Sequence, residues 1–219
     1  LLCIYKEQIQ ENTFHEVNSK LKKKEVFFGK CGLNLFYTLQ NNILTITGNG
    51  EMNNYEFNLD SYSEPNSTSP WDFQKKSIRG LSISSEATSI GSYAFYYLSY
   101  LTSVIIPENI ISIGSYAFSG CSSLTNIIIP EGVQSIGQSA FSYCSQLQII
   151  QLPTNLSILN YNLFKECTKL NNFEIPENIE VFSSSLFSKC TSLTFTSIPK
   201  TMTTIESNTF SNCNSLTSI

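Results

Sequence analysis

The chain has 219 residues but a single histidine, His15, and it contains no glycine-rich phosphate-binding loop. A Ser-His or Cys-His nucleophile pair needs an imidazole beside the nucleophile, and His15 stands apart from the regular part of the sequence. Closely spaced cysteine or histidine ligands, which are typical of zinc sites, are missing as well. We therefore expect no enzymatic activity, no metal site and no cofactor.

Positive charge is scarce, and so are long apolar runs. Residues 81–219 contain four basic and eight acidic side chains, whereas nucleic-acid binding needs lysine and arginine to neutralise phosphates. No apolar run reaches the roughly 18 residues that a transmembrane helix requires. We therefore expect neither a nucleic-acid partner nor a membrane span in this segment.

What the sequence does contain is a 23-residue repeat. Proline recurs at this step, and so do cysteine and phenylalanine. The repeated residues are Pro107, Pro130, Pro153, Pro176 and Pro199; Cys121, Cys144, Cys167, Cys190 and Cys213; and Phe95, Phe118, Phe141, Phe164, Phe187 and Phe210. A fixed period of this length is the signature of stacked units that bury their apolar sides against each other. The repeat predicts a solenoid.

One repeat shows how the unit is built. In Asn126-Ile127-Ile128-Ile129, β-branched residues favour a strand, so we expect Ile127 and Ile129 to point into the core and Asn126 and Ile128 to point outward. Pro130 should end this strand because proline has no N–H for the ladder. Each unit is therefore predicted to contribute one strand to a parallel stack.

A bend is expected before the Ala-Phe pair of each unit. Glycine stands there in three units, which suits either a positive φ or a close backbone approach. Later units replace it, so a strict need for positive φ is not expected. The glycines are Gly91, Gly114 and Gly137, and the later residues are Asn160, Ser183 and Glu206.

The stretch Ser135-Ile136-Gly137-Gln138-Ser139-Ala140-Phe141-Ser142-Tyr143-Cys144-Ser145-Gln146-Leu147 resembles the BspA-type leucine-rich repeat. The resemblance covers about six units, from Ile78 to Ile219. The preceding segments 31–39, 43–52 and 70–71 are similar to the β-rich cap found before such repeats. The resemblance implies a leucine-rich-repeat solenoid, mainly β with short helical or 3-10 turns and a parallel strand stack, preceded by a small β-rich cap.

Three regions are expected: an N-terminal segment over residues 1–30, the β-rich cap over 31–77, and the solenoid over 78–219. In the first region, the spacing of Phe14, Val17 and Leu21 indicates an amphipathic helix. In the cap, Asn41-Asn42 is expected to form the turn of a hairpin, because asparagine tolerates left-handed angles.

Both ends of the sequence suggest a piece of a longer protein. It starts at Leu1, not at methionine, and it stops at Ile219 inside an expected strand, whereas solenoids normally carry caps at both ends. We therefore expect the solenoid to be truncated at the C-terminus. The first five residues fit either the end of a secretory signal or the apolar start of a helix.

The regular cysteines could be half-cystines or buried free thiols. The first unit has Leu98 at the position of Cys121, and a leucine can replace a core side chain but not a disulfide partner or a metal ligand. Buried thiols that act as small apolar side chains are therefore the preferred interpretation, and their redox state stays open.

The outward side chains of the strands form the expected binding surface, on the face that such solenoids make concave. Apolar residues among them favour a protein partner, since contiguous exposed apolar patches usually mark interaction sites. Isoleucine also simply suits a strand, so both interpretations stay open. The outward positions are Ser103, Ile105, Asn126, Ile128, Ile149, Gln151, Asn172, Glu174, Phe195 and Ser197.

A non-catalytic protein-binding module is the function class that this leaves. The family resemblance implies a cell-surface or secreted adhesin-like protein that contacts host or matrix proteins. An intracellular scaffold is the alternative, because cytosolic cysteines stay reduced. Asn66 and Asn155 begin glycosylation sequons that would be used only in a secretory pathway. The oligomeric state stays open.

Overall fold

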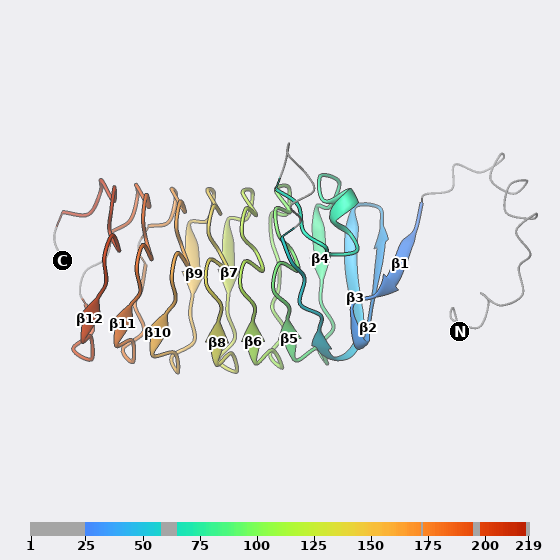
Figure 1. The fold of residues 1–219 in the computed structure, drawn as a ribbon, viewed down its shortest axis with the longest axis horizontal. Coiled ribbons are helices and arrows are strands. Elements are labelled where there is room, and N and C mark those ends of the chain that lie inside the picture. The colour runs from blue at the N-terminus through green and yellow to red at the C-terminus, as the bar shows by residue number, and fades with distance from the viewer. Residues whose placement is uncertain (1–24, 58–64, 172, 195–197, 218–219) are drawn as a thin grey trace, which may run out of the picture.

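The structure is a computed structural model that describes residues 25–57, 65–171, 173–194 and 198–217. Figure 1 shows a row of stacked turns, with a sheet at the N-terminal end and the last turn at the other end. The leucine-rich-repeat solenoid predicted from the 23-residue period is thus confirmed, and so is the β-rich cap that precedes it.

The cap is a sheet with the strand order β1-β2-β3-β4. Its strands are β1 (Phe27–Lys30), β2 (Gly32–Gln40), β3 (Ile43–Met52) and β4 (Gly80–Ser82). Strands β1, β2 and β3 pair antiparallel, and β4 pairs parallel to β3. Asn41 and Asn42 form the hairpin turn with φ values of 54° and 66°, as expected.

The cap sheet begins earlier in the chain than the expected boundary at residue 31. Residues 27–30 belong to the expected N-terminal segment, but they form strand β1 and pair with β2 from Phe27↔Leu39 to Lys30↔Phe36. The physical reason is that Tyr37 and Leu39 of β2 are buried, and a further strand with Phe27 packed on the core extends that sheet. The expected amphipathic helix, with Phe14, Val17 and Leu21, lies outside the described residues.

A short 3-10 helix, η3 (Asp72–Gln74), follows Trp71, which joins the cap to the solenoid. The Trp71 side chain is fully buried, and its Nε1 donates a hydrogen bond of 2.7 Å to the carbonyl of Ala94. Its ring stacks on Phe95 at 5.8 Å between centroids. Trp71 therefore covers the apolar end of the first turn with a ring that also satisfies a backbone acceptor.

The repeat phenylalanines continue this contact as a column through the solenoid. Successive rings lie between 5.2 and 6.1 Å apart, and most pairs are nearly parallel. Leu163, Leu186 and Thr209 replace the alanine that precedes the phenylalanine in other units, and all three are buried. The larger side chains are thus accommodated within the core.

Two sets of short parallel strands run along the solenoid. The longer set uses the two residues before the bend position of each unit, which are Ser-Ile in the first three units. Its strands are β5 (Ser89–Ile90), β6 (Ser112–Ile113), β8 (Ser135–Ile136), β10 (Ile158–Leu159), β11 (Val181–Phe182) and β12 (Thr204–Ile205). The second set precedes the repeat prolines and contains β7 (Asn126–Ile128) and β9 (Ile149–Gln151). The pairing partners are always 23 residues apart. The sequence predicted only the second set, with one such strand in every unit. Among the described residues this set consists of two strands, β7 and β9.

The bend glycines are needed for close approach and not for their φ. A Cβ atom on Gly137 would lie 2.4 Å from the backbone nitrogen of Ser115 in the preceding turn, and Gly114 has the same relation to Ser92. Neither glycine has a positive φ. Where Asn160 takes this place, its side-chain nitrogen donates to the carbonyl of Ile136 at 2.6 Å, so the later turn replaces tight packing with a hydrogen bond.

Candidate functional site

The outward face of β7 and β9 carries exposed isoleucines, as the alternation predicted. Ile127 and Ile150 are buried, whereas Ile128 is 60% exposed and Ile149 is 62% exposed. Ile105, at the same position one turn earlier than Ile128, is 85% exposed. We call Ile105, Ile128 and Ile149 the isoleucine face. The other expected outward residues that the structure describes are also exposed: Ser103, Asn126, Gln151 and Glu174.

The register shows how these isoleucines lie relative to each other. Asn126 pairs with Ile149, and Ile128 pairs with Gln151, so Ile128 and Ile149 are diagonal neighbours on one face. Each isoleucine therefore has a polar residue directly beside it, and the face is mixed. Three of the expected positions, Asn172, Phe195 and Ser197, lie outside the described residues.

A second surface feature was not predicted from the sequence: a groove with tyrosines along one side. It has a volume of about 250 Å³ and is lined by two rows of residues that recur every 23 positions. The first row is Tyr97, Gly120, Tyr143 and Glu166; the second is Ser99, Ser122, Ser145 and Thr168. Because the turns stack with a 23-residue offset, both rows run along the solenoid axis.

The tyrosine row has an unusual backbone. Tyr97, Tyr143 and Glu166 have φ values of 54°, 60° and 62°, which is the left-handed region that bulky side chains rarely adopt. Gly120 has a φ of 76° and leaves space for the Tyr97 ring, because a Cβ there would lie 2.4 Å from Tyr97 Cδ2. The Tyr97 ring therefore lies over the glycine.

Charge in the groove is largely cancelled. Glu166 is paired with Lys189, whose Nζ lies 2.7 Å from Glu166 Oε1. This hydrogen bond and the carboxylate charge raise the pKa of Lys189. Burial raises the pKa of Tyr97, and the nearby Tyr143 and Glu166 raise it further, so the Tyr97 phenol is protonated and can donate at neutral pH.

The opposite wall consists of hydroxyl groups that hold neighbouring turns together. Ser122 Oγ donates to the Ser99 carbonyl at 3.4 Å, and Ser145 and Thr168 make the same bond in the next two turns. The sequence indicates this groove only weakly. Its pattern there is two tyrosines that stand two repeats apart, with a glycine at the same position in the repeat between them.

The regular cysteines are buried free thiols, as preferred above. All six described cysteines are buried and free. In the repeats each Sγ also donates to the carbonyl of the phenylalanine 26 residues earlier, as in Cys144 to Phe118 at 3.2 Å. Burial raises the pKa of Cys144 to about 12 and that of Cys213 to about 11. Such thiols are poor nucleophiles.

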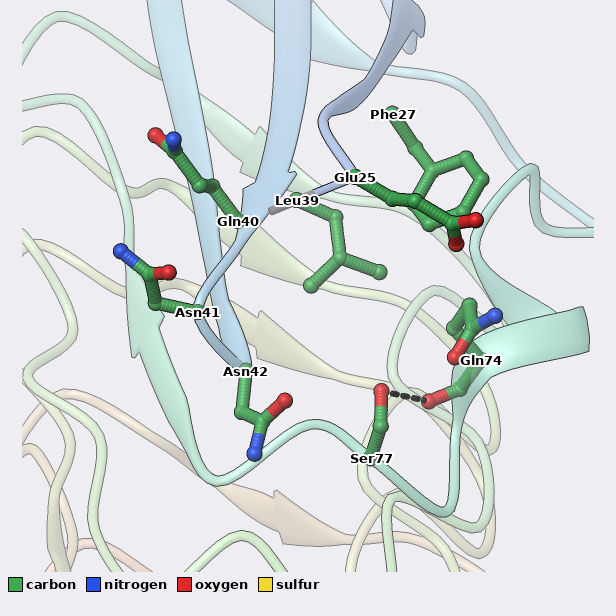
Figure 2. Close-up of a pocket in the computed structure, with 8 residues that line it drawn as sticks. All are labelled: Glu25, Phe27, Leu39, Gln40, Asn41, Asn42, Gln74 and Ser77. Atoms are coloured by element: carbon green, nitrogen blue, oxygen red, sulfur yellow. Dashed lines mark hydrogen bonds between the residues drawn. The ribbon is translucent and has the colours of Figure 1, made fainter. Parts of the chain in front are cut away.

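The cap has a further pocket of about 360 Å³ at the hairpin turn (Figure 2). Its lining is mostly amide and apolar side chains, and Ser77 Oγ donates to the Gln74 carbonyl at 2.8 Å. The lining residues are Glu25, Phe27, Leu39, Gln40, Asn41, Asn42, Gln74 and Ser77. Glu25 is the only ionisable side chain among these lining residues, and a single carboxylate supplies no acid–base pair.

Neither a metal cluster nor a membrane span is found among the residues that the structure describes. No group of three or more His, Cys, Asp or Glu side chains in those ranges could hold a metal ion. Over the same ranges, no helix has the length and hydropathy that crossing a membrane requires.

The two sequons differ in accessibility. Asn155 is exposed, although its Nδ2 donates to the Glu131 carbonyl at 3.2 Å. Asn66 is half-buried and its Oδ1 accepts a hydrogen bond from Lys75. Asn155 is therefore the more accessible of the two, and glycosylation at either stays a prediction.

Three solved structures of bacterial proteins are similar to this chain. The T. pallidum Leucine Rich Repeat protein is 25% identical, with a TM-score of 0.63, over 82% of this chain and 86% of that one. A leucine rich cell surface protein from Faecalibacterium prausnitzii A2-165 is 22% identical, with a TM-score of 0.52, over 64% of this chain and 52% of that one. A leucine-rich repeat protein from Bacteroides ovatus ATCC 8483 is 23% identical, with a TM-score of 0.52, over 83% of this chain and 54% of that one.

The chain thus spans about half of the length of the F. prausnitzii and B. ovatus proteins. A search of curated proteins finds no match to the sequence. The model of the BspA type leucine rich repeat region matches residues 66–194 in six copies. Since this match extends over more than half of the sequence, the chain belongs to the BspA type leucine rich repeat family.

Proposed function

We propose that this chain is a non-catalytic protein-binding module of a cell-surface or secreted adhesin-like protein that contacts host or matrix proteins. The observation that carries the proposal is the isoleucine face. A side chain as exposed as Ile105, at 85%, gains nothing from its own fold, and burying such a residue against a partner stabilises a complex by roughly 1.5–3 kcal/mol.

The cell-surface assignment is supported by similarity. The F. prausnitzii protein with the same architecture is described as a cell surface protein. An intracellular scaffold is the second candidate. The free thiols are as compatible with a scaffold as with a surface protein, because reduced cysteines persist in the cytosol.

Antibody labelling of intact and permeabilised cells of the source organism separates the two locations. The surface proposal expects staining of intact cells and loss of the epitope after brief protease treatment of those cells. Staining that appears only after permeabilisation contradicts the surface proposal and supports the scaffold.

The binding surface is tested by the double substitution Ile128→Asp with Ile149→Asp. Two carboxylates at these diagonal positions should reduce binding to immobilised matrix proteins by at least about tenfold, because charges are excluded from the dry centre of an interface. Binding is measured by surface plasmon resonance, and circular dichroism verifies the fold.

The matched control is Ile111→Asp, since Ile111 is 48% exposed but does not belong to the isoleucine face. This variant should bind as the unchanged chain does. Equal loss of binding in both variants, or unchanged binding in the double variant, would show that the isoleucine face is not the contact surface.

A further inference from the structure

We propose that the tyrosine-lined groove is a second binding site, separate from the isoleucine face, and that it takes a proline-rich peptide in the polyproline II conformation. The groove is defined by Tyr97, Gly120, Tyr143 and Glu166 on one side and by the Ser99 to Thr168 hydroxyls on the other. Its rows run along the solenoid axis, so an extended ligand fits it.

The spacing of the two tyrosines matches the repeat of this ligand. Tyr97 and Tyr143 are two turns apart, and two turns at a strand spacing of about 4.8 Å cover about 9.6 Å. A polyproline II helix has three residues per turn and repeats every 9.3 Å or so. Prolines at positions i and i+3 of the peptide therefore present the same edge to Tyr97 and to Tyr143. The turn between them carries Gly120, and the Tyr97 ring lies over this glycine, so the aromatic surface extends over the intervening turn.

Hydrogen-bonding groups in the groove complement such a peptide. A polyproline II segment has no internal hydrogen bonds, so its carbonyls are free acceptors. Within the described part of the chain, neither the Tyr97 nor the Tyr143 phenol has a hydrogen-bond partner, and both can donate. Glu166 is already neutralised by Lys189 at 2.7 Å, so the groove does not require a cationic ligand.

The tyrosines also occupy positions that the backbone alone would not select. The same left-handed row holds Gly120, Glu166, Lys189 and Asn212 in the other turns, and glycine and asparagine adopt such φ values more readily than tyrosine, glutamate or lysine. The groove is also preformed on rigid turns, and polyproline II peptides are stiff, so little conformational entropy is lost on binding.

Decaproline labelled with fluorescein, followed by fluorescence anisotropy, tests the proposal. Saturable binding is expected, and Tyr97→Ser or Tyr143→Ser should weaken it by at least about tenfold, since each removes an aromatic face and a phenol donor. Tyr143→Phe retains the ring and should give a smaller loss. A labelled Gly-Ser peptide of equal length should not bind.

Tyr161→Ser is the matched control, because Tyr161 is 47% exposed but does not line the groove. It should bind decaproline normally. The Ile128→Asp, Ile149→Asp double variant should also bind decaproline normally, because its substitutions change only the isoleucine face. Thermal unfolding verifies that the Tyr143→Ser chain is folded.

Two results overturn the proposal. One is decaproline binding that does not saturate or that is equal in the Tyr97→Ser, Tyr143→Ser double variant. The other is binding of neutral hexasaccharides, such as maltohexaose or cellohexaose, that is lost in these same variants while decaproline is not bound. The second result would assign the groove to a glycan.

Discussion

At the scale of single residues, the buried thiols should make the fold sensitive to alkaline pH. Burial raises the pKa of Cys31 and Cys144 to about 12, well above the ordinary thiol value. In the unfolded chain these thiols ionise first, so the unfolded state binds fewer protons as the pH rises from about 9 to 12. Stability is fully present below pH 9 or so and falls above it, by about 1.4 kcal/mol per pH unit for each thiol.

Urea unfolding at pH 8, 9 and 10 checks this expectation. The matched variant is Cys144→Ala. Its free energy of unfolding should be lower at pH 8. Its loss of stability per pH unit should be smaller by the contribution of one thiol. An unchanged slope would mean that Cys144 titrates alike in both states.

The same cysteines illustrate what a residue reveals before the fold is known. Their burial could be predicted, because Leu98 replaces one of them and a leucine can only be a core side chain there. The hydrogen bond from Cys144 Sγ to the Phe118 carbonyl could not, because it depends on how adjacent turns are offset. Residue type indicates a side chain's environment, whereas its partner depends on the stacking geometry.

At the scale of one turn, the left-handed positions limit which residues the repeat accepts. Two positions in each complete turn have positive φ, and most carry residues other than glycine. Ser185→Gly, at a φ of 56°, should raise the free energy of unfolding by up to about 1 kcal/mol because it removes the Cβ clash. Ser185→Val should lower it by more than about 1 kcal/mol, since β-branched residues fit this region worst.

Ser192→Gly provides the comparison for the same chemical change. Ser192 is in the same turn and has no positive φ, so glycine there should lower stability by about 0.5–1 kcal/mol through greater freedom of the unfolded chain. The variants are compared by chemical denaturation. Opposite signs for the two Ser→Gly changes are expected; the same sign would contradict the account of strain.

These left-handed positions also explain why the groove was not predicted. Alternating apolar and polar residues show which side of a strand faces out, so Ile128 and Ile149 could be assigned from the sequence. Tyr97 lies over Gly120, and Tyr143 lines the same groove, because both have a backbone conformation that tyrosine rarely adopts. The longer set of strands was not predicted for a related reason, since two residues such as Ser135 and Ile136 are too short for a periodic signal.

At the scale of the whole molecule, the solenoid should lose structure from an uncovered end. Each turn contacts mainly its neighbours, so stability is a sum over turns and their interfaces. Trp71 covers the first turn by stacking on Phe95 and by donating to Ala94. Trp71→Ala should therefore destabilise the first turn by about 3–5 kcal/mol, and turns further along progressively less.

Hydrogen exchange followed by mass spectrometry measures this gradient. In Trp71→Ala, amides of the first turn such as Phe95 and Tyr97, which donate to the second turn, should exchange much faster, whereas Phe187 and Lys189 should change little. Trp71→Phe keeps an aromatic ring but removes the donor to Ala94, so its effect should be smaller and confined to the same turn. If instead all turns lost protection equally, the cap and the repeats would unfold as one unit. In that case a partner that binds the isoleucine face would stabilise every turn of the solenoid, and not only the turns that it contacts.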